Sequence, residues 1–354
     1  MGTARRDAWL PPEGFHNVYV ACYHFFGEHS EEEGGCFQNI LIQGVVSMRT
    51  KTIRLVVFFF VMLFVLSGCQ TLSGGEKRGD SSEKLRVVVS IPPLRDFTTW
   101  LGENWVDVTM LVEPGFSPHT LELRPKHIQA LAEADVILFN GRGLEPWAKE
   151  ALQSANPKAR VVYVTETERF RTQPYGTNAH LWMSIPWAKE YVRVIHDALA
   201  AEVQPESPAR GTISVNRIRV LDALDNLQLE LERTIKAIPL ERRRVAVLHA
   251  VWEPFLEPYD FYILQLPKSE KQFHGHTQEI PPNTLFDWAN RIETHGVYAV
   301  ILEEQHPVPA LETLCEDIGV PLVYLDPLGG VPGRETYPDM MRHNARKLVE
   351  VLAP

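Results

Sequence analysis

Short apolar runs alternate with amphipathic stretches from about residue 85 onward. The segments "LRVVVSI", "VDVTMLV", "VILF" and "ARVVYVT" are short and rich in Val, which is typical of buried strands. Between them, "DFTTWLGENW" predicts a helix, and so does "PKHIQALAEA", which begins with a proline at an early helical position. Strands that alternate with helices predict an α/β fold in which the sheet is mostly parallel.

The same alternation resumes after Pro239. The segments "RRVAVLHAV", "DFYILQL", "VYAVILEE" and "PLVYLDPLGG" predict strands, while "PNTLFDWANRIETHG" and "YPDMMRHNARKLVEVL" predict helices. Gly296 is a stop signal at the end of the first of these helices. The sequence therefore predicts two similar α/β lobes, one at residues 86–206 and one at residues 239–354.

Residues 207–238, between these lobes, follow a different pattern. Apolar residues recur every three or four positions from Val215 to Ile238, and charged residues fill the gaps between them. No glycine or proline interrupts Thr212–Ile238. This periodicity predicts one amphipathic helix about 40 Å long. We expect this helix to join the lobes as a rigid spine.

An export signal is predicted ahead of the first lobe. Arg49, Lys51 and Arg54 precede an apolar run of 12 residues, which is too short to cross a bilayer comfortably. The small residues that follow it, just before Cys69, resemble the lipobox of bacterial lipoproteins. We interpret residues 48–68 as a signal peptide and Cys69 as the site of lipidation, with a signal anchor or a buried strand as the alternatives.

The processing of such a signal determines the mature chain. Residues 1–47 precede a complete signal that has its own methionine, so we expect them to be an over-extended start or absent from the mature protein. Residues 69–85 are rich in Gly, Ser and charge, which predicts a flexible tether. The mature protein would then be exported and lipid-anchored to a bacterial membrane, facing the periplasm or the cell exterior.

Composition narrows the functional classes. The 354 residues are 45% hydrophobic and carry a net charge of −10, which fits a globular protein and argues against a nucleic-acid surface. The 4 cysteines form no Cys-x-x-Cys pair, so neither a thiolate zinc knuckle nor a thioredoxin-type motif is present. The sequence also lacks His-Glu-x-x-His and a nucleophile elbow, which argues against a hydrolase.

A set of polar residues near predicted strand ends is the candidate site. His119 follows one strand, His249 and Asp326 each end one, and His180 follows a polar turn. Ligands of parallel sheets gather outside the carboxyl ends of the strands, so these residues could converge in a cleft between the lobes. Three imidazoles and a carboxylate suit Zn²⁺, although single histidines are more often surface or satisfied core residues. Glu303, at another strand end, could accept a hydrogen bond from a metal-bound imidazole or serve as a ligand itself.

Five motifs, in order, resemble those of a known family. They are "VEPGFSPHTLELRP", "ALAEADVILFNGRGLEPW", "AHLWMS", "VLHAVWEPF" and "LDPLG". The segment from Leu85 to the end of the chain is thus similar to the metal-binding lipoproteins of zinc and manganese ABC importers, the cluster A-I (cluster 9) solute-binding proteins. The resemblance implies two α/β lobes joined by one long helix. It also implies that His119, His180, His249 and Asp326 are the ligands, closing a tetrahedral site.

The resemblance also indicates the metal and the partners. Many manganese members of the family have a carboxylate where this chain has His249, so the sequence favours Zn²⁺, with Mn²⁺ or iron as the runner-up. Ala179 stands where the family often has a proline, and the long His-rich loop of many zinc members is missing. We expect a monomer that binds Zn²⁺ and delivers it to an ABC permease and its ATPase. A zinc-dependent hydrolase, a binder of siderophores or cobalamin, and a surface adhesin are the alternatives.

Overall fold

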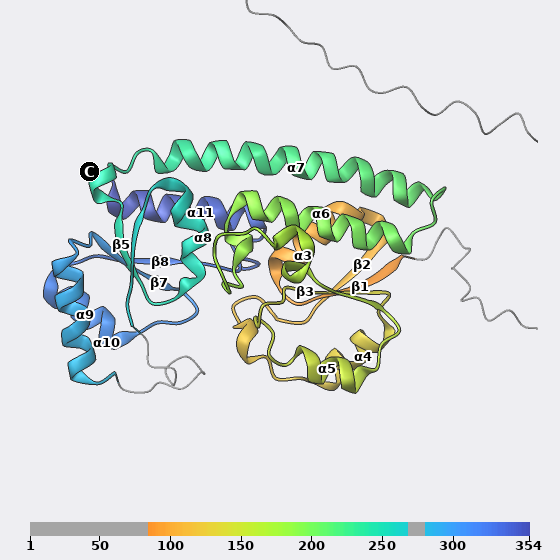
Figure 1. Cartoon of the computed structure of the whole chain (residues 1–354), viewed down its shortest axis with the longest axis horizontal. Coiled ribbons are helices and arrows are strands. Elements are labelled where there is room, and N and C mark those ends of the chain that lie inside the picture. The colour runs from red at the N-terminus through yellow and green to blue at the C-terminus, as the bar shows by residue number, and fades with distance from the viewer. Residues whose placement is uncertain (1–83, 268–279) are drawn as a thin grey trace, which may run out of the picture. The chain divides into compact units, whose positions relative to one another are not determined.

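A computed structural model of the chain describes residues 84–267 and 280–354 (Figure 1). The predicted extension, the signal peptide, Cys69 and almost all of the tether lie outside the described residues. Within these two ranges, no helix is both long and apolar enough to cross a membrane.

The first lobe is built on a four-stranded parallel sheet with the order β2-β1-β3-β4. The strands are β1 (Leu85–Val89), β2 (Val106–Met110), β3 (Val136–Phe139) and β4 (Arg160–Tyr163). The helices are α3 (Pro92–Gly102), α4 (Pro125–Glu133), α5 (Ala148–Ala155) and α6 (Ile185–Glu202). Helices α3 and α6 pack on one face of the sheet, and α4 and α5 pack on the other (Figure 1). Both faces of the sheet are thus covered, which explains why the central strand β3 is apolar throughout and β1 is apolar from Val87 to Val89.

The second lobe repeats this plan, with the parallel strand order β6-β5-β7-β8. Its strands are β5 (Arg244–Val247), β6 (Tyr262–Gln265), β7 (Ala299–Glu303) and β8 (Leu322–Leu325). Its helices are α8 (Glu253–Leu256), α9 (Pro282–Thr294), α10 (Pro309–Ile318) and α11 (Tyr337–Leu352). Helices α8 and α11 contribute to the core on one face of the sheet, and α9 and α10 to the core on the other. In both lobes the loops after the strands emerge at one edge of the sheet, because all strands run in parallel.

The long helix α7 (Pro208–Ile235) runs along both lobes (Figure 1). The hydroxyl of Ser207 caps its first turn by accepting a hydrogen bond from the backbone N–H of Ala209 at 3.2 Å. The helix ends three residues before the predicted end at Ile238. There the guanidinium of Arg243 donates to the carbonyl oxygens of Ile235, at 3.4 Å, and Ile238, at 3.0 Å. The Ile235 carbonyl also accepts from the backbone N–H of Ile238 at 2.9 Å, so the end of the helix is well bonded. These two α/β lobes joined by one long helix confirm the fold class predicted from the sequence.

A single hydrophobic core extends from one lobe into the other. It includes Val87 of β1, Leu227 of α7, Val247 of β5 and Tyr337 of α11. Hydrogen bonds reinforce the same junction: the indole of Trp182 donates to the carbonyl of Pro327 at 2.7 Å, and the Tyr337 hydroxyl donates to the carbonyl of Trp182 at 2.6 Å. The lobes are therefore packed together as well as connected through α7.

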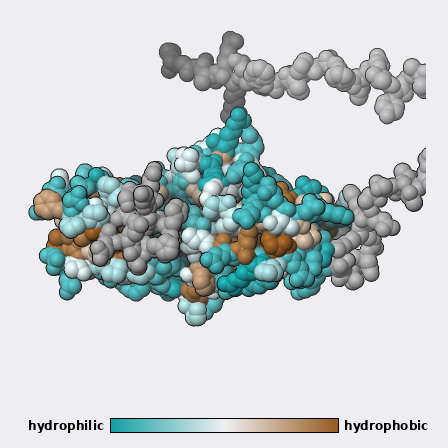
Figure 2. Space-filling model, turned by 90° about the horizontal axis from the view of Figure 1, so that it is seen from below, coloured by the Kyte–Doolittle hydropathy of each residue, from teal (hydrophilic) through white to brown (hydrophobic). Residues whose placement is uncertain are grey.

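The outer surface has the opposite character. On the face drawn in Figure 2, hydrophilic residues cover most of the surface and hydrophobic residues form separate, smaller patches. Along α7, Leu229 is 48% exposed while Leu227 is 2% exposed. From Leu224 to Ile235 the apolar stripe thus faces inward, as its periodicity predicts. Val215 and Ile218, at the predicted start of the stripe, are instead 48% and 58% exposed.

Truncation of an inward leucine of α7 tests this packing. Leu227→Ala should lower the free energy of unfolding by about 2–5 kcal/mol, because it removes buried methyl groups and leaves a cavity. Leu229→Ala, two residues along the same helix, should change it by less than about 0.5 kcal/mol. Urea denaturation followed by circular dichroism measures both. Equal losses for the two variants would show that the helix does not bury this stripe.

Candidate metal centre

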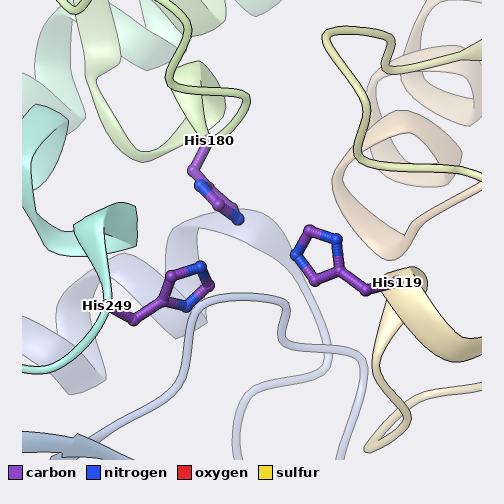
Figure 3. Close-up of side chains that lie close together, drawn as sticks. All are labelled: His119, His180 and His249. Carbon is purple, nitrogen blue, oxygen red and sulfur yellow. The ribbon is translucent and has the colours of Figure 1, made fainter. Parts of the chain in front are cut away.

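His119, His180 and His249 come together between the two lobes, and their rings point toward one another (Figure 3). One nitrogen from each ring lies within 4.8 Å of the other two. The ring centroids are 5.8 Å apart for His119 and His180, 6.0 Å for His119 and His249, and 4.5 Å for His180 and His249. Three residues that are separated by more than 60 positions along the chain thus form one cluster.

His119 is held by a short, well-anchored turn. It lies in the 3-10 helix η2 (Pro118–Thr120), in the connection that follows β2. The Ser117 hydroxyl accepts a hydrogen bond from the backbone N–H of His119 at 3.3 Å. The indole of Trp147 donates to the carbonyl of Pro118 at 2.8 Å. These bonds fix the backbone on both sides of the imidazole.

His180 is oriented by Asn178. It directly precedes the 3-10 helix η5 (Leu181–Met183) and is largely buried. The Asn178 side-chain oxygen accepts from the backbone N–H of His180 at 2.9 Å and lies 3.0 Å from its Nδ1. The amide nitrogen of Asn178 donates to the carbonyl of Ala250 at 2.7 Å, so its oxygen must face His180. Nδ1 of His180 is therefore the donor, which leaves the lone pair of Nε2 for a metal.

His249 follows β5 and is oriented by Glu303 at the end of β7. Its Nδ1 lies 2.6 Å from Glu303 Oε1, while the other carboxylate oxygen lies 3.3 Å from Nδ1 of His306. Burial by itself raises the pKa of Glu303, but the two histidines outweigh it and hold the pKa well below the usual range. Because this carboxylate is ionised, Nδ1 of His249 donates to it and Nε2 is available to a metal. A role of Glu303 as a ligand stays a prediction.

Asp326, the fourth predicted ligand, is not part of this cluster. Its side chain is fully buried at the end of β8, and its Oδ2 lies 3.0 Å from Nε of Arg334. Its Oδ1 accepts a hydrogen bond from the Gln305 side chain at 2.8 Å. The structure thus brings three of the four predicted residues together and pairs the fourth with an arginine.

Asn140 and Trp147, which were not predicted, support the cluster from the "FNGRGLEPW" motif. Asn140 directly follows β3, and its side-chain nitrogen donates to the carbonyl of Ala179, next to His180, at 2.9 Å. Trp147 anchors the turn that carries His119. The strand-end position of Asn140 could have identified it. By contrast, nothing local in the sequence points to Asn178 or Arg334.

The geometry suits a small cation. Three nitrogens bound tetrahedrally to Zn²⁺ at about 2.0–2.1 Å lie about 3.4 Å apart, so small side-chain rotations would close the cluster around the ion. Convergent imidazoles are typical of a bare metal ion. A siderophore or cobalamin would instead need a wide cleft lined by aromatic or arginine side chains. The cluster therefore favours a metal ion over a large chelate.

Comparisons with known proteins point the same way. Residues 87–351 match the family model described as "Zinc-uptake complex component A periplasmic". The chain is 28% identical over 309 residues to the manganese-binding lipoprotein MntA of Halalkalibacterium halodurans, covering 84% of this chain and 99% of MntA. It is 25% identical over 267 residues to a putative metal-binding protein of Thermotoga maritima, covering 75% of this chain and 92% of that protein. Its fold matches the periplasmic zinc-binding protein TroA of Treponema pallidum with a TM-score of 0.66 and 22% identity, over 77% of this chain and all of TroA.

Removal of the Asn178 side chain tests its orienting role. Asn178→Ala should weaken Zn²⁺ binding by roughly 10–100-fold, because His180 then loses the acceptor that fixes its ring and tautomer. Asn104→Ala, at an exposed position outside the cluster, is the control and should leave the affinity unchanged. Competition with a chromophoric chelator gives both dissociation constants. Equal affinities for the two variants would exclude the proposed role of Asn178.

Proposed function

The chain belongs to the "Zinc-uptake complex component A periplasmic" family, and we propose that it captures Zn²⁺ outside the cytoplasmic membrane for import. The membership confirms the predicted resemblance to solute-binding proteins of metal ABC transporters. It also confirms that the chain is a transport component and not an enzyme. The observation that carries the proposal is the convergence of His119, His180 and His249.

The choice of Zn²⁺ rests on the ligand atoms. Three imidazole nitrogens suit Zn²⁺, whereas Mn²⁺ prefers carboxylate, carbonyl and water oxygens. Relatives are named for other metals: MntA for manganese, and MtsA of Streptococcus pyogenes, 23% identical over 322 residues, for iron. Mn²⁺ and iron are therefore the alternatives. Asp326, which the family resemblance implies as a fourth ligand, can serve a metal only after Arg334 has released it.

Delivery needs a membrane-bound partner. We propose that Cys69 carries a lipid, and that the tether after it keeps the metal-binding lobes near an ABC permease and its ATPase. The protein would act there as a monomer, facing the periplasm or the cell exterior. Binding and release of the ion are the whole task, so no catalytic residue is required.

Metal content tests the ligand assignment. Wild-type protein loaded with equal zinc and manganese should hold one zinc per chain by elemental mass spectrometry. His119→Ala and His249→Ala should each lose it, because one imidazole of three is removed. His295→Ala, a histidine whose Nδ1 contacts the Tyr262 hydroxyl, should keep it. Manganese in place of zinc would contradict the metal, and metal that persists in both cluster variants would contradict the site.

Solution scattering tests how the lobes respond to the ion. The shared core and α7 restrict hinge motion, so metal-free and zinc-loaded protein should have nearly equal radii of gyration. A pronounced compaction on zinc binding would show that the lobes close like a wide hinge. In that case the packing at the lobe junction would not be rigid.

A further inference from the structure

The Asp326 carboxylate is held by an unusually complete set of neutral donors. Its Oδ1 accepts from the Gln305 side chain at 2.8 Å and from the backbone N–H groups of Leu328 at 2.9 Å and Gly329 at 3.0 Å. Asn344 bonds both the N–H and the carbonyl of Asp326, at 2.9 and 2.7 Å. Three residues therefore fix Oδ1, Asn344 fixes the backbone of Asp326, and only Oδ2 remains to meet a cation.

Arg334 already occupies that position. Its Nε lies 3.0 Å from Oδ2 of Asp326, so the two groups form an ion pair. The angle between them is not that of a hydrogen bond, and neither atom has another hydrogen-bond partner among the described residues. Its Nη1 donates to Glu304 at 2.7 Å and lies 3.2 Å from Nε2 of His343. The arginine side chain is itself only 15% exposed. The guanidinium is thus held in place from two directions and faces the one carboxylate oxygen that a metal could use.

Arg334 ends a turn that packs against the loop that carries His119. The N–H of Gly330 donates to the Arg334 carbonyl at 2.8 Å, and the Arg334 N–H donates to the Val331 carbonyl at 2.9 Å, which forms a tight turn. A Cβ on Gly330 would lie 3.1 Å from Cγ of Pro114, so this turn packs directly against the start of the loop that carries His119. The turn that ends in Arg334 therefore lies beside the loop that carries His119.

We propose that Arg334 determines the metal specificity of the site by holding Asp326 away from the ion. This inference rests on the proposed function and concerns the same site. A metal that needs the Asp326 oxygen as a ligand must displace a buried guanidinium. A metal that binds through the three imidazoles alone leaves the guanidinium in place. Zn²⁺ can be held by three imidazoles with a water in its fourth position, whereas Mn²⁺ prefers oxygen ligands such as this carboxylate. The ion pair therefore selects against Mn²⁺.

Arg334→Gln tests this selection. The substitution removes the competing charge, so the dissociation constant for Mn²⁺ should fall about tenfold or more while that for Zn²⁺ changes less than about threefold. Full-chain protein purified in mild detergent is titrated with each metal alone, in competition with a chromophoric chelator. Mn²⁺ should also raise the Tm of this variant more than that of wild type, because it takes the place of the lost cation.

Two further variants complete the test. Arg342→Gln, on α11, removes an arginine that pairs with the exposed Glu230, and should leave both affinities unchanged. Asp326→Asn should change the Zn²⁺ affinity less than about threefold, because in the wild type this carboxylate stays with Arg334. The Asp326→Asn measurement needs no substitution at Arg334, so even where Arg334→Gln does not fold it can overturn the premise that Zn²⁺ binds without this carboxylate.

Specific results would overturn the proposal. A parallel change of both affinities in Arg334→Gln, or no change, would show that Arg334 does not discriminate between metals. A loss of Zn²⁺ affinity of about tenfold or more in Asp326→Asn would show that zinc binding recruits this carboxylate. Both results leave wild-type zinc binding intact and so leave the proposed function standing. Wild-type protein that binds neither metal would overturn the proposed function and this inference together.

Discussion

The site depends on the hydrophobic core that the two lobes share. His119 comes from the first lobe and His249 from the second, and their nitrogens lie within 4.8 Å of each other. Imidazoles on separate lobes can serve one ion only while the two lobes hold them close to the binding geometry. The continuous core along α6, α7 and α11 supplies that constraint. The cluster can therefore be preformed, and ion binding need not provide the energy to assemble it.

Hydrogen bonds transmit this rigidity from the core to the rings. Asn178 is central, because it orients His180 and also bonds the backbone beside His249. Glu303 adds a negative charge behind His249, which makes that imidazole a better electron donor to a cation. Asp326 shows the opposite arrangement, since its charge is balanced within the protein by Arg334. The charge that the centre offers to a cation thus depends on Glu303 and Arg334 as much as on the histidines and Asp326 that they contact.

Much of this architecture could be read from the sequence, because it follows from local patterns. Short continuous apolar runs located the strands, and the three-to-four spacing located α7. The rule that ligands gather at strand ends predicted that His119 and His249 would converge, but it placed Asp326 with them as well. The end of α7 was predicted three residues too late, because the capping side chain of Arg243 comes from outside the helix. The helices α5 and α10 were not predicted. The pairing of Asp326 with Arg334 was not predicted either, because it depends on a tertiary contact that single-sequence patterns do not contain.

X-ray absorption at the zinc edge tests the central claim most directly, because it counts the imidazoles around the bound ion. Zinc-loaded wild-type protein should show the multiple-scattering signature of three histidine rings at about 2.0–2.1 Å. A shell made of oxygen atoms, or one that contains a single imidazole, would contradict the account, because the convergence of the three rings would then have no part in binding the metal.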